Sequence, residues 1–157
     1  MAGATPKLIK ELREMTGAGM LDCKNALNET DGDLEKAVQA LREAGLGKAA
    51  KKAGNVAAEG VVAVKVNDDN TVATLLELNA QTDFVAKNQN FLDLTQEIVS
   101  HAQANNIADA EALAASTING TSFSDFLNGK IATIGENLVA RKLTSVTGTV
   151  VNGYVHT

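Results

Sequence analysis

Few side chains of this sequence have the chemistry of a catalytic centre. The chain has one cysteine, Cys23, and two histidines, His101 and His156. Cys23 falls on the apolar face of an expected helix, where a thiol is far more often a small hydrophobic side chain than a nucleophile. We expect His101 to lie on a helix surface or to be partly covered, and His156 to lie in the frayed end of the chain. A hydrolase or transferase would have to use Cys23 or His101, and we do not expect an enzyme.

Metal and phosphate sites also lack support in the sequence. No His, Cys, Asp or Glu residues have the spacing of metal ligands. The acidic "NDDN" stretch at 67–70 lacks the glycine and the distant glutamate of a calcium loop. The glycines form neither a GxxxxGK[ST] loop nor a GxGxxG turn after a strand. We therefore expect no metal and no cofactor.

One short stretch is better suited to contacting another protein. In "ELNAQTDFVAKN", an apolar strand-like segment runs into Thr82, Asp83, Phe84 and Val85. A turn between a strand and a helix is a place where rigid scaffolds commonly present functional residues. The alternative is that Thr82 or Asp83 caps the helix while Phe84 and Val85 fill the core. From the residues alone, an exposed probe and a core plug both stay open.

Three short helices are expected in residues 1–45. The first begins with Thr5 as its N-cap and Pro6 at its first position. The third starts near "TDGD" and ends at Gly45. The apolar residues that recur at helical spacing in these two helices are Leu8, Ile9, Leu12, Met15, Leu34, Ala37, Val38 and Leu41. This pattern predicts a small three-helix module.

The second helix has one apolar face, formed by Cys23, Ala26 and Leu27. At about 100° per residue, Leu21 falls nearly opposite this face, so we expect Leu21 to be exposed, with Met20 at the edge of the face. A single exposed leucine needs no functional explanation. The alternative is that Leu21 and Met20 together form a small docking patch.

Residues 46–60 are rich in Gly, Ala and Lys and are expected to form a partly helical linker. Residues 61–157 then form a core domain. Its first part, "VVAVKV" and "TVATLLELN", predicts two antiparallel strands joined by a polar loop. Later residues repeat at helical spacing: Phe91, Leu94, Ile98, Ala102, Leu127, Ile131, Ile134 and Leu138. The expected fold is α+β, a three-helix bundle followed by an antiparallel sheet packed with helices.

The C-terminal stretch "SVTGTVVNGYVHT" predicts a strand and then a turn at Asn152 and Gly153. Only four residues follow this turn, which is too few for a returning strand of usual length. We interpret the core domain as truncated inside a hairpin. The alternative is an open edge strand that awaits a partner.

Composition sets the class of protein. A chain of 157 residues with 45% hydrophobic and 21% charged residues is typical of a globular protein. The net charge of −5 argues against direct nucleic-acid binding. Lys48, Lys51 and Lys52 cluster locally, but such lysines more often form a solvated face than a phosphate site. No run suits a secretory signal or a membrane span, and a single cysteine suits a reducing compartment, so we expect a cytoplasmic protein without membrane contact.

Four stretches in order along the chain resemble the bacterial translation elongation factor Ts family. They are "LREMTGAGMLDCKNAL" at 12–27, "KAAKKAGNVAAEG" at 48–60, "ELNAQTDFVAK" at 77–87 and "IGENLVARK" at 134–142. Two departures keep the chemistry of their sites: Ala80 stands where the family often has Cys or Ser, and Leu21 where Met is frequent. Family members also continue past the last residue of this sequence, and some have a helical hairpin used for dimerisation, so the oligomeric state stays open.

The resemblance implies a guanine-nucleotide exchange factor for the GTPase elongation factor Tu. It implies that Asp83 and Phe84, with Thr82 and Val85 beside them, insert near the magnesium site of that GTPase and speed GDP release. It also implies that the N-terminal module, which resembles ubiquitin-associated (UBA) domains, binds a second surface of the same GTPase. The residues implied in that contact are Leu12, Met20, Leu21 and Lys24. The alternative function is a passive protein-binding module without exchange activity.

Overall fold

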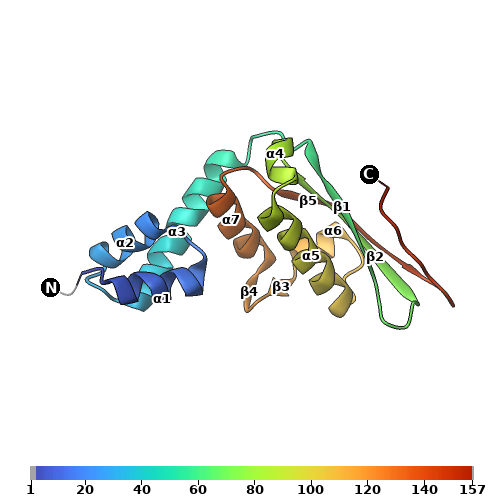
Figure 1. The fold of residues 1–157 in the computed structure, drawn as a ribbon, viewed down its shortest axis with the longest axis horizontal. Helices are drawn as coiled ribbons and strands as arrows, with labels where there is room; N and C mark the ends of the chain where they lie inside the picture. Colours follow the sequence, from blue (N-terminus) through green and yellow to red (C-terminus); the bar gives the residue numbers. More distant parts are fainter. Residues whose placement is uncertain (1–2, 157) are drawn as a thin grey trace. The chain divides into compact units, whose positions relative to one another are not determined.

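The computed structural model describes residues 3–156, which form an α+β fold with two compact units (Figure 1). The N-terminal unit comprises the residues up to Ala53 together with Asn128–Gly135. The core unit comprises Gly54–Leu127 and the residues from Glu136 onward. Within the described residues, no helix is both long enough and apolar enough to span a membrane. The expectation of mixed helices and antiparallel sheet is confirmed.

The N-terminal unit is built on α1 (Pro6–Thr16), α2 (Met20–Glu29) and α3 (Leu34–Lys52). Thr5 caps α1 as expected, because its hydroxyl oxygen accepts a hydrogen bond from the Leu8 amide at 3.2 Å. The helix ends at Gly17, whose φ of 68° is the left-handed conformation that glycine adopts without strain. The buried core of the three helices consists of Leu12, Cys23, Ala26, Leu27 and Ala37. The predicted apolar face of the second helix is therefore confirmed.

The expected end of the third helix at Gly45 is wrong. Helix α3 continues through this residue to Lys52, so it includes the first part of the segment 46–60, which was expected to be a partly helical linker. Gly45 is buried, and a Cβ added there would lie 3.7 Å from the Ala132 side chain in α7 (Phe123–Ile134). Gly45 thus lies inside α3, beside Ala132 with room for a methyl group, and does not end the helix. The alanines and lysines that follow are good helix formers and continue the helix.

The core unit contains a three-stranded antiparallel sheet in the order β1-β2-β5. The strands are β1 (Glu59–Val66), β2 (Val72–Ala80) and β5 (Val139–Thr147). The predicted hairpin is confirmed, with Val61 opposite Leu78 and Val66 opposite Ala73. Strand β5 pairs with the other edge of β2, where Asn79 lies opposite Val139. Strand β2 is therefore central, and its C-terminal end is held between two neighbours.

Helix α5 (Gln89–Ala104) packs on β1 and β2, and α6 (Ala110–Ala114) packs near β5 (Figure 1). The expected apolar face of α5 is confirmed, because Phe91, Leu94, Ile98 and Ala102 are all buried. A two-stranded hairpin that the sequence did not predict, β3 (Thr117–Ile118) with β4 (Thr121–Ser122), connects α6 to α7. The last predicted helix, α7, ends at Ile134, so Leu138 lies beyond it but is buried in the core unit.

The C-terminal segment differs from the expected hairpin. Strand β5 ends at Thr147, and no strand is present around Asn152 and Gly153. The Val151 amide donates a hydrogen bond to the Asn70 carbonyl at 2.6 Å, and Val151 is buried. Contacts with the loop after β1 thus hold this segment in an irregular path, and the predicted turn is wrong.

Candidate protein-binding site

Helix α4 (Asp83–Ala86) follows β2 almost directly and forms the candidate site. Thr82 has extended backbone angles and caps this four-residue helix, because its hydroxyl oxygen accepts a hydrogen bond from the Val85 amide at 3.4 Å. Ala86 is buried and Val85 is half-buried, so the helix is seated on the core unit by its C-terminal half. We call residues 81–85 the 81–85 turn.

Phe84 projects from this turn and is 84% exposed. The alternative in which Phe84 fills the core is therefore wrong. Burial of aromatic rings is a large part of the hydrophobic stabilisation of small domains. An exposed ring does not contribute this stabilisation to the fold. The fold holds Phe84 out of its own core, which leaves the ring free for contact with another molecule.

Asp83 lies beside the ring and carries a negative charge. Its carboxylate accepts a hydrogen bond from the Lys87 ammonium at 3.1 Å, and both side chains are largely exposed. The hydrogen bond from Lys87, followed by the charge of that ammonium, lowers the pKa of Asp83 below its usual value. The turn therefore presents an aromatic ring and an ionised carboxylate on adjacent residues.

A carboxylate from a distant part of the chain holds the base of the turn. Glu136 Oε1 accepts hydrogen bonds from the backbone amides of Gln81 at 3.2 Å and Thr82 at 3.1 Å. Its Oε2 accepts a third hydrogen bond from the Thr82 hydroxyl at 2.8 Å. The Thr82 hydroxyl thus donates to Glu136 and accepts from the helix it caps. Thr82 is an internal support of the turn, and its hydroxyl makes one hydrogen bond as donor and one as acceptor within the chain.

The Gln81 side chain adds a second set of contacts. Its Oε1 accepts hydrogen bonds from the Asn137 amide at 2.7 Å and from the Asn55 side chain at 3.1 Å. Asn137 in turn donates from its side chain to the Asn55 carbonyl at 2.9 Å. Sequence reasoning missed Glu136, Asn137 and Asn55 as site residues. The "IGENLVARK" stretch contained two of them, but nothing in their spacing indicated contact with residues more than 50 positions away.

The N-terminal unit presents a separate apolar patch on α2. Met20 is 61% exposed and Leu21 is 68% exposed, so the expected exposure of Leu21 is confirmed. Lys24 is also exposed. Leu12, expected beside them, has no exposed surface because it lies in the core of the three helices. Its role is packing, and the expectation that Leu12 lies on a contact surface needs correction.

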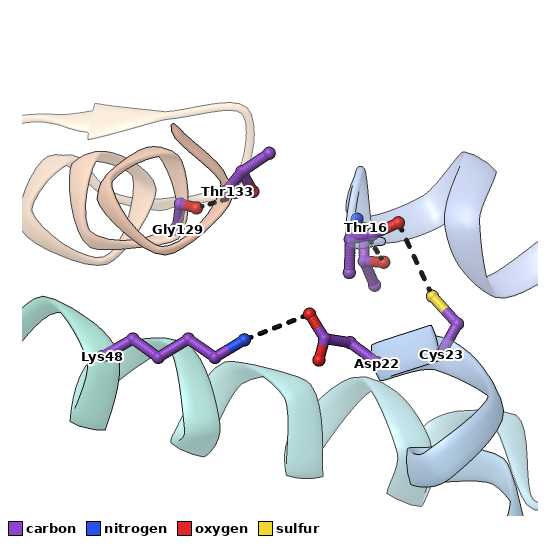
Figure 2. A network of polar contacts seen from close by, with 7 residues as sticks. Thr16, Asp22, Cys23, Lys48, Gly129 and Thr133 are labelled. Carbon is purple, nitrogen blue, oxygen red and sulfur yellow. Dashed lines mark hydrogen bonds and ion pairs between the residues drawn. The ribbon is translucent and has the colours of Figure 1, made fainter. Parts of the chain in front are cut away.

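The patch lies next to a groove and an ion pair. The groove, of about 670 Å³, lies between α1 and the start of α2 and is lined by residues that include Ile9, Arg13 and Met20. Lys48, from the expected linker lysines, pairs with Asp22 at 3.1 Å (Figure 2). Lys48 thus joins α3 to α2, which is a structural use for one of the three clustered lysines.

Cys23 and His101 occupy structural environments. Burial raises the pKa of the Cys23 thiol, whose sulfur lies within hydrogen-bond reach of Thr16 (Figure 2).

His101 Nδ1 accepts a hydrogen bond from the Asn105 amide group at 3.2 Å, so Nε2 carries the proton and donates to the Ser116 hydroxyl at 3.1 Å. That hydroxyl donates to the Leu113 carbonyl. Among the described residues, no group of acidic, His or Cys side chains could hold a metal ion.

Comparison with known proteins gives a consistent family. Residues 81–157 match the family model described as Elongation factor TS. The chain is 77% identical to Elongation factor Ts of Aliarcobacter butzleri over 99% of its own length and 45% of that protein. It is 57% identical to Elongation factor Ts of a Sulfurovum species over 99% of its length and 44% of that protein. The chain therefore spans less than half the length of the curated relatives it matches.

Proposed function

Because this chain belongs to the elongation factor Ts family, we propose that it acts in translation elongation as a guanine-nucleotide exchange factor. Its partner is the GTPase elongation factor Tu, and its effect is to promote GDP release. The observation that carries this proposal is the 84% exposure of the Phe84 ring on a short, capped turn. The factor acts in the cytoplasm through protein contacts and uses no metal or cofactor of its own.

Phe84 is the anchor of the contact. Buried aromatic side chains dominate many protein interfaces, and truncating one that fills a partner's pocket commonly costs more than about 2 kcal/mol of binding free energy. Because Phe84 is already exposed in the free chain, its insertion requires no unfolding of the core unit. Val85, which is half-buried on the same short helix, lies next to Phe84 in this contact.

Asp83 acts beside the ring, near the magnesium site of the partner. The ionised carboxylate either accepts hydrogen bonds from displaced backbone amides or competes for the cation. Displacing the groups that hold magnesium removes charge neutralisation from the bound diphosphate, so GDP dissociates faster. Since the factor and the nucleotide weaken each other's binding to the GTPase, incoming nucleotide also weakens binding of the factor by the same ratio.

The N-terminal unit provides a second contact with the same GTPase. We infer that its three helices form a UBA-like bundle whose partner surface is Met20, Leu21 and Lys24. Two adjacent exposed apolar side chains and one lysine favour a partner surface with apolar and acidic groups. Two contacts on one partner raise the overall affinity beyond that of either alone.

The test is the rate of release of fluorescent GDP from elongation factor Tu, measured with the 157-residue chain and its variants. We expect Phe84→Ala and Asp83→Ala to slow release strongly at saturating factor, and Leu21→Ala to raise the factor concentration needed for half-maximal rate. Tyr154→Ala is the matched control, because it removes another aromatic ring that is 79% exposed. Equal rates for all variants would reject the proposal. Binding without any acceleration by the unmodified chain would identify a passive binding module.

A further inference from the structure

We infer that Glu136 is a positioning residue for Phe84, acting through the base of the 81–85 turn. This inference rests on the proposed function and names a residue outside the contact proposed there. Glu136 is half-buried just before β5, and both of its carboxylate oxygens point into the chain at the residues that precede α4. The function proposed above assigns no role to this carboxylate.

The hydrogen bonds to Glu136 fix the peptide groups that set the direction of α4. One oxygen receives two consecutive backbone amides, at 3.2 and 3.1 Å, and the other receives the hydroxyl of the residue that caps α4. Hydrogen bonds to an ionised carboxylate are shorter and roughly twice as strong as neutral ones. The carboxylate therefore determines the orientation of the Thr82 cap, from which the helix starts.

Helix α4 depends on such support because it has only four residues. Isolated helices shorter than about 12 residues are marginal in water, so α4 does not hold its own direction. Its Thr82 cap, together with the packing of Val85 and Ala86 on the core unit, orients it. An exposed ring on a loosely held turn would lose conformational freedom on binding, whereas a fixed turn avoids this cost.

The sheet itself does not need Glu136. Asn79 in β2 already pairs with Val139 in β5, next to the turn, and the Gln81 side chain is held independently by Asn137 and Asn55. Removal of the carboxylate should therefore loosen residues 82–85 while the sheet stays folded. This separation makes a positioning role distinguishable from a general structural one.

The first experiment measures the mobility of the ring position without any partner. The chain contains no tryptophan, so Phe84→Trp creates a single reporter at this position. Adding Glu136→Ala should increase the amplitude of nanosecond motion seen by time-resolved fluorescence anisotropy, with circular dichroism unchanged. Glu136→Gln keeps one oxygen for the two amides and should give a smaller increase. Glu111→Ala, which removes an exposed acid on α6, is the control. Unchanged anisotropy in both Glu136 variants would overturn the inference.

The second experiment is a double-mutant cycle on GDP release from elongation factor Tu. Glu136→Ala should slow release about tenfold in the unmodified chain, since misplacement of a functional group by about 1 Å can cost up to a hundredfold. In the Phe84→Ala background the same change should have no further effect. An equal loss in both backgrounds contradicts positioning. If Phe84→Ala leaves release unchanged, the proposed function fails while the anisotropy result still tests Glu136. Should Glu136→Ala not fold, Glu136→Gln replaces it in both experiments.

Discussion

Phe84 and Phe91 are seven residues apart and have opposite environments: Phe84 is 84% exposed, and Phe91 has no exposed surface. Phe91 lies in the first turn of α5 and packs into the core unit, whereas Phe84 lies on α4 and faces away from it. The same side chain therefore serves stability at one position and is available for recognition at the other. Replacing each ring by alanine therefore tests stability at position 91 and recognition at position 84 separately.

Truncation of the two rings should affect stability very differently. Phe91→Ala leaves a cavity in the core and should lower the free energy of unfolding by about 3–5 kcal/mol. Phe84→Ala removes an exposed side chain and should change it by less than about 0.5 kcal/mol. Urea denaturation followed by circular dichroism measures both values. A large loss of stability in Phe84→Ala would show that the ring is packed in solution.

The Thr82 hydroxyl should stabilise the turn through both of its hydrogen bonds. Thr82→Val keeps the shape of the side chain but removes the bond to Glu136 at 2.8 Å and the cap of α4. We expect the free energy of unfolding to fall by about 0.5–2 kcal/mol, the usual range for loss of an N-cap. Hydrogen exchange should show faster exchange at the Val85 amide, and urea denaturation gives the global effect. Thr82→Ser keeps the hydroxyl and is the control, so an equal loss in Thr82→Ser would exclude the hydroxyl as the cause.

The core elements of this fold were predictable from periodicity, and the supports of the turn were not. The apolar face of α2, the face of α5 and the β1–β2 hairpin follow from spacings of a few residues, which a single sequence displays. The contact between Thr82 and Glu136 joins residues 54 positions apart, and such contacts leave no local pattern. Exposure of Phe84 was open for the same reason, because it depends on how α4 is seated.

Two wrong predictions came from local signals that tertiary contacts override. Asn152 and Gly153 have the composition of a hairpin turn, but the bond from the Val151 amide to Asn70 sets the path of this segment. Leu12 falls within a stretch implied to contact a partner, yet it occupies the centre of the N-terminal core. A stretch of sequence that resembles a family thus contains both surface and core residues, and burial is needed to separate them.

The charge of Asp83 should depend on Lys87. The hydrogen bond and charge of Lys87 lower the pKa of Asp83 in the folded chain. A carboxyl with a lowered folded-state pKa contributes stability above its ordinary pKa, and this contribution is lost as the pH falls through the folded-state value. We expect Lys87→Met to raise the pKa of Asp83 toward its ordinary value, as measured by NMR titration of the carboxyl group.

Asp33 is an internal control for this titration. The pKa of Asp33 is also lowered, chiefly because its carboxylate accepts a hydrogen bond from the Lys36 backbone amide. Lys87→Met should therefore leave the pKa of Asp33 unchanged. An Asp83 pKa that does not respond to Lys87→Met would place the cause of the lowered value in the backbone of the helix start.

The glycine that was expected to end α3 should be replaceable by alanine with a gain in stability. Gly45 lies inside the helix, and a Cβ there would meet Ala132 at 3.7 Å, an ordinary van der Waals distance. Glycine in a helix interior costs about 1 kcal/mol relative to alanine, so Gly45→Ala should raise the free energy of unfolding by about 0.5–1 kcal/mol. Gly47→Ala, in the same helix with nothing near its added Cβ, should give a similar gain. Gly45→Leu should destabilise the chain, because the larger side chain has no space beside Ala132. A loss in Gly45→Ala together with a gain in Gly47→Ala would mean that α3 and α7 pack more closely in solution than a methyl group allows.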